Sequence, residues 1–335
     1  MPKKLFLIVL VFSILSIAVW YVYEHGGIKG GEETVHTHHI VVLNPGGETF
    51  TIFLDSFMKE IRKIHHEQGL SIVIDYKNTE GSKEKLKTYI DEAIAEKPDL
   101  IATISTRPTF DLADKTKTIP ILTALGDPIA HGYFKSIQSS GINIAGISHQ
   151  SIELTPKRIE LIKKMIPSIK NIAMFYDTTC GPTAIARPIG KELSKKLGIT
   201  LTEFSLTNPG RKEIEDAFMG VDWKKFDALM FYPHGTLFSQ SDLFLKVARE
   251  NKLPIIMPDK AALNGGALAS YGPDYADMGR SLARIAEKVL QGEDPGALPF
   301  ETPSKIDFVL SIKNAKEIGV TFSEEIKSIA SQIVN

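Results

Sequence analysis

Polar residues that could hold a small molecule stand in short turns after predicted strands. One such turn is Ser105-Thr106-Arg107-Pro108. A guanidinium beside hydroxyl groups at a helix start can hold a carboxylate or phosphate by two hydrogen bonds. We therefore predict that Ser105, Thr106 and Arg107 contact a ligand. The alternative for Arg107 is an exposed ion pair with Asp111.

Other turns offer carboxylates, hydroxyls and an imidazole. Asp127, before Pro128, either starts a turn or binds a cationic group. The run Asp177-Thr178-Thr179 precedes a helix, so its threonines either cap that helix or donate to a ligand. His234 and Asp259 follow later strands, where each contacts a ligand or bonds to nearby backbone. The first turn, Asn44-Pro45-Gly46-Gly47, completes the set of candidates.

Motifs of catalysis are missing from the chain. Cys180 would act as a nucleophile only beside a base, and nothing local supplies one. The sequence also lacks a P-loop spacing, His-Glu-x-x-His, Gly-x-Ser-x-Gly and Cys-x-x-Cys. We predict binding without chemical change, with no catalytic residue, no metal and no cofactor.

The elements that must position these turns alternate between short β-rich runs and amphipathic helices, which is typical of parallel sheets with helices on both faces. The predicted strands are Ile40–Leu43, Ser71–Tyr76, Leu100–Ile104, Ile119–Ala124, Ile142–Ser148, Asn171–Tyr176, Thr200–Ser205, Ala228–Tyr232 and Ile255–Met257. The predicted helices are Thr49–Glu67, Lys83–Glu96, Glu153–Ile166, Thr183–Leu197, Arg211–Met219 and Ser241–Asn251. Helix-start signals stand at Ser82, Thr155-Pro156 and Ser241-Asp242. Because ligands collect outside the carboxyl ends of such strands, the turns are where a site is expected.

Composition limits the classes of protein that this chain can belong to. Of its 335 residues, 43% are hydrophobic and 24% charged, with a net charge of −1. About three hundred residues follow the N-terminal region, enough for two compact domains. The charge balance argues against nucleic acid as a partner. The single cysteine cannot form an internal disulfide.

The N-terminus predicts export. Lys3 and Lys4 precede an apolar run from Leu5 to Tyr23, so residues 1–23 are expected to be a signal peptide or a signal anchor. Ser16-Ile17-Ala18 has a cleavage pattern, whereas the aromatics from Trp20 to Tyr23 favour a retained anchor. The rest of the protein is expected outside the cytoplasm, at the periplasmic or extracellular face.

Residues 24–38 predict a flexible linker, because they are short, polar and Gly-rich. Four histidines lie in or beside it, namely His25, His36, His38 and His39. Imidazoles bind transition metals, but a flexible tract supplies no fixed geometry. We interpret the tract as a solvated tether.

One stretch resembles a signature of the extracytoplasmic substrate-binding proteins of ABC transporters, in the branch with tryptophan- and tyrosine-binding members. It runs from Asn264 to Tyr275 and continues in Met278-Gly279-Arg280. The likeness extends to Val289–Pro295, Glu301-Thr302-Pro303 and Asn314–Gly319, and upstream to Ile119-Pro120-Ile121, Asp127-Pro128 and Gly141–Ser148.

The resemblance implies a type I periplasmic-binding-protein fold, in which two similar lobes, each a parallel sheet flanked by helices, are joined by three crossovers. On this analogy lobe 1 comprises residues 39–147 plus 274–298, and lobe 2 comprises 148–273 plus 299–335. The crossovers are expected near Ile147–Ile152, Tyr271–Asp274 and Pro299–Ser304.

The resemblance also implies how a ligand is held, with hydroxyls and backbone N–H groups on a carboxylate and acidic residues on an amine. Thr106, Asp127, Thr178, Thr179 and Asp259 occupy matching places. Tyr271 and Asp177 complete the predicted site. The chain departs from the pattern at Asn44–Gly47, at Arg107 and at His234-Gly235, which leaves an anionic or modified ligand open beside an aromatic amino acid.

The expected function is that of a monomeric solute-binding protein that closes on a small polar ligand and delivers it to an ABC permease. One alternative is a membrane-tethered sensory module that reports ligand binding to a receptor. Another is an extracytoplasmic enzyme on the same frame, with Asp127, Asp177 or His234 as acid or base.

Overall fold

The computed structural model describes residues 37–335 except positions 131, 135 and 233. The predicted signal or anchor, residues 1–23, and the predicted linker up to His36 lie outside the described residues. In the described part, no helix combines the length and the apolar character needed to cross a bilayer.

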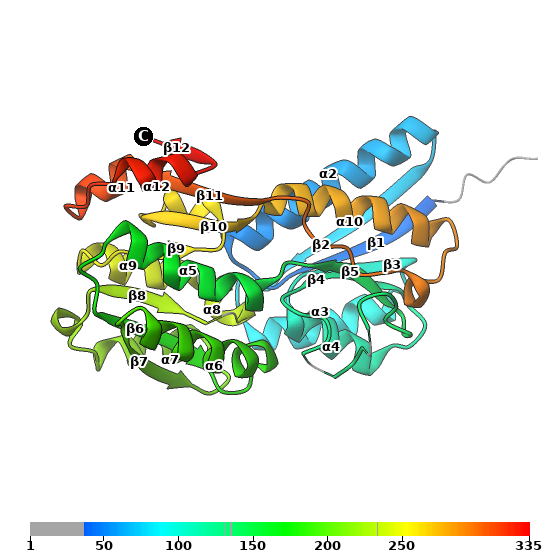
Figure 1. The fold of residues 1–335 in the computed structure, drawn as a ribbon. Helices are drawn as coiled ribbons and strands as arrows, with labels where there is room; N and C mark the ends of the chain where they lie inside the picture. The colour runs from blue at the N-terminus through cyan, green and yellow to red at the C-terminus, as the bar shows by residue number, and fades with distance from the viewer. Residues whose placement is uncertain (1–36, 131, 135, 233) are drawn as a thin grey trace, which may run out of the picture. The chain divides into compact units, whose positions relative to one another are not determined.

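The first lobe is built on a five-stranded parallel sheet in the order β2-β1-β3-β4-β5 (Figure 1). Its strands are β1 (Thr37–Asn44), β2 (Ser71–Asn78), β3 (Leu100–Thr103), β4 (Ile121–Leu125) and β5 (Ile144–Ser148). Strand β1 starts before the predicted linker ends, because Thr37 already pairs with Ser71. His38 and His39 therefore belong to the sheet and not to a solvated tether.

Four helices accompany this sheet: α2 (Glu48–Gln68), α3 (Lys83–Ala95), α4 (Thr106–Lys115) and α10 (Tyr275–Leu290). The amphipathic helix predicted over Thr49–Glu67 is confirmed, since Phe53, Leu54, Phe57 and Ile61 on one side of α2 are fully buried. Burying one such side chain contributes about 1.5–3 kcal/mol. Helix α10 lies directly on α2, and a Cβ on Gly279 would come within 2.1 Å of the Phe53 carbonyl oxygen. Helix α10 thus packs beside the N-terminal part of the chain.

The second lobe contains a parallel three-stranded sheet, β7-β6-β8, and a four-stranded sheet, β12-β11-β10-β9. Its strands are β6 (Asn171–Asp177), β7 (Thr200–Leu206), β8 (Ala228–Phe231), β9 (Ile256–Met257), β10 (Ala269–Pro273), β11 (Ile306–Ser311) and β12 (Gln332–Val334). Strands β10 and β11 are antiparallel, which the alternating strand and helix pattern did not predict. The two sheets lie edge to edge, because Leu229 N–H donates to the Pro254 carbonyl at 3.1 Å.

The helices of the second lobe cover both of its faces (Figure 1). They are α5 (Ser151–Met165), α6 (Gly181–Lys196), α7 (Arg211–Met219), α8 (Gly235–Ser239), α9 (Ser241–Glu250), α11 (Ile312–Glu317) and α12 (Glu324–Ile329). Short 3₁₀ turns are η1 (Trp223–Lys225), η2 (Lys260–Leu263) and η3 (Pro295–Ala297).

Of the three helix starts predicted from the sequence, two are confirmed and one is wrong. Ser82 caps α3 as predicted, because its side chain accepts a hydrogen bond from Lys85 N–H at 3.2 Å. Helix α9 begins at Ser241, also as predicted. The start predicted at Thr155-Pro156 was wrong, because α5 begins at Ser151 and Pro156 lies inside it. The Thr155 hydroxyl donates to the Ser151 carbonyl at 2.7 Å and so bonds back within the helix.

The chain passes between the lobes three times. It leaves the first sheet after β5 and enters α5, and it returns from β10 into α10. Its last passage precedes β11, where Glu301 forms a parallel bridge with Ile147. The predicted class, two α/β lobes joined by three crossovers, is therefore confirmed.

Candidate functional site

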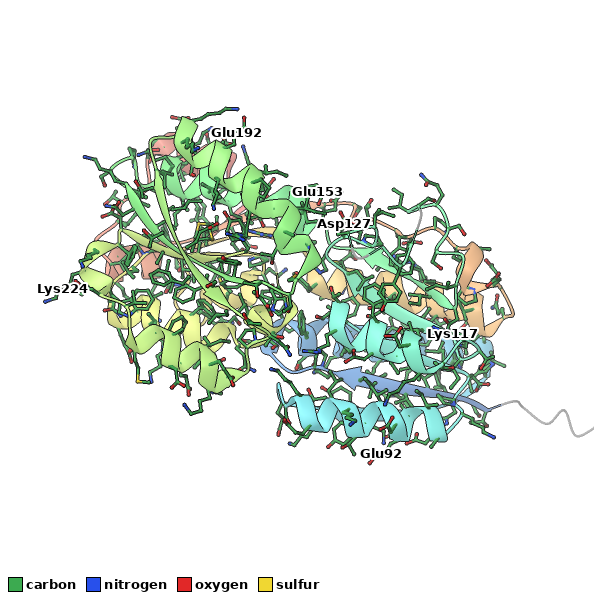
Figure 2. The ribbon with its side chains drawn as sticks, turned by 90° about the horizontal axis from the view of Figure 1, so that it is seen from below. Glu92, Lys117, Asp127, Glu153, Glu192 and Lys224 are labelled. Atoms are coloured by element: carbon green, nitrogen blue, oxygen red, sulfur yellow. The ribbon has the colours of Figure 1, made fainter. Side chains whose placement is uncertain are left out.

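A cavity lies where the carboxyl ends of strands from both lobes meet, and it encloses about 710 Å³ of space free of protein atoms, counting its open mouth. Figure 2 shows Asp127 of the first lobe and Glu153 at the start of α5 close to the junction of the lobes. The walls carry four aromatic side chains, Phe50, Phe231, Phe238 and Tyr275. Phe238 packs against both Phe50 and Tyr275, with ring centroids 5.3 and 5.7 Å apart.

The first lobe contributes Ser105 and Thr106 at the N-terminus of α4. Ser105 has φ 82° and ψ 153°, a region that is costly for any residue with a Cβ. Its backbone is held by a bond from its N–H to the Ala124 carbonyl at 2.9 Å and by the Thr109 hydroxyl, which donates to its carbonyl at 2.7 Å. Strained backbone of this kind concentrates at functional sites.

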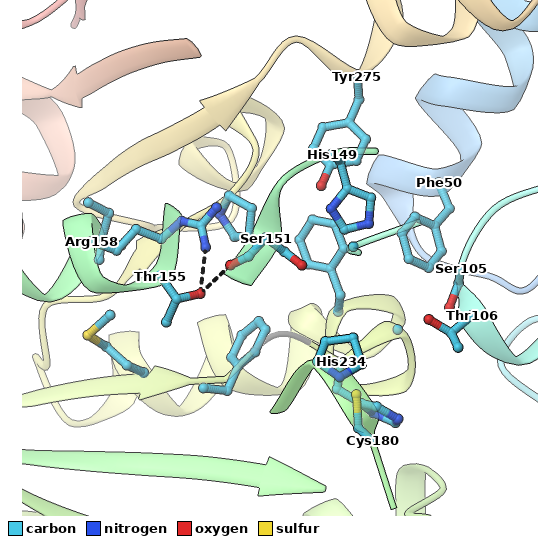
Figure 3. Close-up of a pocket in the computed structure, with 18 residues that line it drawn as sticks. Phe50, Ser105, Thr106, His149, Ser151, Thr155, Arg158, Cys180, His234 and Tyr275 are labelled. Atoms are coloured by element: carbon cyan, nitrogen blue, oxygen red, sulfur yellow. Dashed lines mark hydrogen bonds between the residues drawn. The ribbon is translucent and has the colours of Figure 1, made fainter. Parts of the chain in front are cut away.

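Across the cavity, α5 and the residue pair before it contribute His149, Ser151, Thr155 and Arg158 (Figure 3). Arg158 is only 5% exposed. Its Nε donates to the Tyr271 carbonyl at 2.8 Å, and its Nη1 lies 3.4 Å from the Thr155 hydroxyl. Burial lowers the pKa of Arg158 to about 10, so the guanidinium stays charged at neutral pH.

His149 is neutral at physiological pH. Burial, followed by the charge of Arg158, lowers its pKa to about 4. The residue as a whole is half-buried and lines the cavity. Its ring centroid lies 6.2 Å from that of Tyr275, whose pKa burial raises.

The second lobe also contributes His234, which stands before α8. Its Nε2 lies 3.2 Å from Oδ2 of Asp177, a carboxylate that is 1% exposed. The other oxygen of Asp177 accepts from Thr179 N–H, the Thr179 hydroxyl and Asn208 N–H at 2.8, 2.8 and 3.1 Å. Asp177 is therefore held rigidly and fixes the position of His234. Cys180 lines the cavity beside them, and burial raises the pKa of its thiol.

Asn44, Asp127 and Thr178, also predicted from the sequence, are not among the residues that line the cavity. The Asn44 side chain donates to Thr51 and Tyr76 hydroxyls at 2.9 and 2.7 Å, and it accepts from Gly46 N–H. Asp127 accepts from Ile129 N–H and Ala130 N–H at 2.7 and 3.0 Å, as a turn initiator does. Thr178 shares a hydrogen bond with Thr207, at 3.0 Å.

The remaining predicted residues have structural partners as well. Asp259 caps η2 by accepting from Ala261 N–H, and burial raises its pKa. The Tyr271 ring packs near Phe308, and its carbonyl accepts from Arg158. Gly47 touches Ser239 of the second lobe, since a Cβ on it would come within 2.8 Å of the Ser239 Cα.

Arg107 bridges the two lobes. Its guanidinium donates to the Asn208 side chain in the second lobe and lies 3.7 Å from Asp111 in its own helix. The ion pair with Asp111, considered as the alternative, is thus present. Lys83 reaches the Asn208 carbonyl from the same lobe as Arg107.

The sequence analysis did not predict four polar residues of the cavity wall, His149, Ser151, Thr155 and Arg158, or its four aromatic side chains. Because the start predicted at Thr155-Pro156 lies four residues too late, the pattern does not indicate that the first turns of α5 face the cavity. No local signal identifies the four polar residues, because a single arginine on an amphipathic helix has the pattern of a solvated side chain.

Two α/β lobes that enclose an aromatic-lined cavity define a protein that binds a small molecule between its lobes. The chain belongs to the ABC transporter substrate-binding proteins, whose family model matches residues 48–334. It therefore acts as a substrate-binding component, with a small-molecule ligand and a transporter permease as its partners. Proteins of this family work outside the cytoplasm, and the family is one of binding proteins, not enzymes.

Individual relatives agree with this assignment. A tyrosine-binding protein from Clostridioides difficile strain R20291 is 29% identical over 264 residues, covering 78% of this chain and 75% of that protein. A Streptococcus pneumoniae ABC domain in complex with L-Trp is 27% identical with a TM-score of 0.77, covering 88% of this chain and all of that one. The ligand-free, open structure of a Clostridium difficile substrate-binding protein with adhesive properties is 26% identical with a TM-score of 0.60, covering 89% of this chain and 99% of that one.

Proposed function

We propose that this protein captures an amino acid with an aromatic side chain, or a close analogue, in the cavity between its lobes. The observation that carries the proposal is a single cavity lined by four aromatic side chains and a buried arginine. Aromatic walls favour a flat apolar group, and a few fixed polar groups orient it. The tyrosine-binding relative and the relative in complex with L-Trp support this ligand class.

The proposed mechanism is hinge closure. Two relatives of nearly equal identity to this chain differ in how well their structures match it, with a TM-score of 0.77 for the L-Trp complex and 0.60 for the open form. This difference supports the described conformation as the closed one. Ligand contacts from both lobes exist together only in that conformation, so binding shifts the protein toward it.

We assign direct ligand contact to Ser105, Thr106 and His234 among the residues predicted from the sequence. Asp177 affects ligand binding indirectly, because it positions His234. Arg107 affects ligand binding by a contact between the two lobes that stabilises closure. The lobe limits, 39–147 with 274–298 and 148–273 with 299–335, stay part of the proposal. So do a membrane tether through residues 5–23, a monomeric state and release of the ligand chemically unchanged.

A thermal-shift series on the full-length protein in detergent tests the proposed ligand class. L-tryptophan, L-tyrosine and L-phenylalanine should each raise the melting temperature, because a ligand at about 100 times its Kd stabilises the folded state by about 2.7 kcal/mol. L-alanine, L-lysine and glucose serve as controls and should leave it unchanged. The proposal fails if no aromatic amino acid shifts the transition or if glucose shifts it equally.

A further inference from the structure

The guanidinium of Arg158 is a buried charge at the cavity wall. Outside positions 131, 135 and 233, no carboxylate of residues 37–335 lies within ion-pair distance of it, and its hydrogen bonds go to the Tyr271 carbonyl and the Thr155 hydroxyl. Burying a charge without an opposite charge is costly. A buried guanidinium of this kind in the wall of a binding cavity favours an anionic group of the ligand.

The neighbours of Arg158 suit an anion too. The hydroxyl of Ser151 is buried and has no hydrogen-bond partner among the described residues. It lies close to Gly126 of the first lobe, since a Cβ on Gly126 would come within 2.4 Å of the Ser151 Oγ. The Nδ1 of His149 is also buried without a partner in that part of the chain. Neither residue is acidic, so neither repels an anion. In Figure 3 this group lies opposite Ser105 and Thr106.

We propose that Arg158, together with Ser151 of the same cavity wall, is the receptor for the carboxylate of the ligand. The inference rests on the proposed function and adds an orientation to it: the carboxylate lies at α5 of the second lobe, and the aromatic group lies toward Phe50 and Phe238. This placement differs from the sequence-based expectation, in which hydroxyls at positions such as Thr106 bind the carboxylate. Uncharged analogues of the same size are then rejected, because they leave the guanidinium buried and unpaired.

The test compares L-tryptophan with L-tryptophanamide, which has the same size but lacks the carboxylate charge. Isothermal titration of the full-length protein should show that the wild type binds the acid about 30-fold more tightly than the amide. In Arg158→Met the acid should lose about that factor, while the amide changes little. The preference of the acid over the amide should therefore nearly vanish in this variant.

Control variants separate a receptor from a structural residue. Arg158→Lys keeps a charge and should retain part of the preference, whereas Arg284→Met, at an exposed position of α10, should retain all of it. Thr106→Val should weaken the acid and the amide equally. The ligand-free Arg158→Met protein should melt at or above the wild-type temperature, because it lacks an unpaired buried charge.

Three outcomes would overturn the inference. One is an unchanged preference for the acid in Arg158→Met, which would leave the proposed function standing. Another is loss of the preference in Thr106→Val instead, which would place the carboxylate at α4. If the wild type binds no aromatic amino acid at all, the proposed function and the inference fail together.

Discussion

Gly235 of the second lobe lies so close to Ser105 of the first that a Cβ on Gly235 would come within 1.8 Å of Ser105 Oγ and 3.0 Å of its Cβ. The two residues thus close one end of the cavity, since both line it. Only a residue without a Cβ allows the lobes this approach.

Gly235→Ala should therefore oppose closure and weaken ligand binding by about 5- to 150-fold, as expected for a steric clash of about 1–3 kcal/mol. The melting temperature without ligand should stay near that of the wild type, because open lobes remove the clash. Gly220→Ala is the matched control, since the nearest atom to its new Cβ would be the Ala217 carbonyl oxygen at 3.7 Å. Equal affinity of both variants would show that this contact does not limit closure.

The contact between Arg107 and Asn208 should stabilise the closed form by a small amount. Asn208 has φ 46°, so Asn208→Gly removes the side chain without backbone strain. Because the Arg107 side chain is about half exposed, we expect each single variant, Arg107→Met or Asn208→Gly, to lower affinity by only about two- to fivefold. In a double-mutant cycle measured by titration, the double variant should lose less binding free energy than the two single variants lose together. Strictly additive losses would contradict a direct contact in the closed state.

His149 should make the fold sensitive to acid. Its pKa is about 4 in the folded protein against an ordinary 6.5, so the unfolded chain takes up a proton first as pH falls. The contribution of neutral His149 to the free energy of unfolding is complete above pH 6.5. It is lost progressively between pH 6.5 and pH 4, by up to about 3 kcal/mol. The half-buried position of His149 at the cavity wall reduces this value, because a less buried ring is less costly to protonate.

Urea unfolding at pH 7 and pH 4.5 checks this expectation. His149→Gln should lose less stability than the wild type between these two pH values. His66→Gln, at an exposed position of α2, should behave like the wild type. If all three proteins lost the same amount of stability between pH 7 and pH 4.5, His149 would not be the source of the acid sensitivity.

Ser105→Gly should stabilise the protein by about 1 kcal/mol, because glycine adopts φ 82° and ψ 153° without a Cβ penalty. The same variant removes a hydroxyl from the cavity and should weaken ligand binding. Denaturant unfolding and titration measure the two effects separately. Ser241→Gly, at a helical position, should instead destabilise. A destabilised Ser105→Gly protein would show that the hydroxyl contributes more than the strain costs.

The sequence alone determined the succession of strands and helices, because apolar periodicity is a local property of the chain. Strands β1 to β9 and helices α2, α3, α5, α6, α7 and α9 lie where the pattern predicted them, within a few residues. The antiparallel pair β10 and β11 was not predicted, since pairing direction depends on segments that are more than thirty residues apart. The two lobes follow from two successive series of alternating strands and helices, whereas the three crossovers came from the family resemblance.

The residues of the candidate site also fall into two groups, those that the sequence predicts and those that only the tertiary structure assigns to the cavity. Ser105, Thr106 and His234 were found because they follow strands, and the carboxyl ends of parallel strands meet at one edge of a sheet. Arg158 could not be assigned to the cavity from the sequence, because one arginine on an amphipathic helix reads as a solvated side chain. Only the tertiary structure, which turns that side of α5 toward the first lobe, made it a buried charge facing a cavity. Local pattern thus decided which residues end the strands, and the packing of the lobes decided which of them face one another.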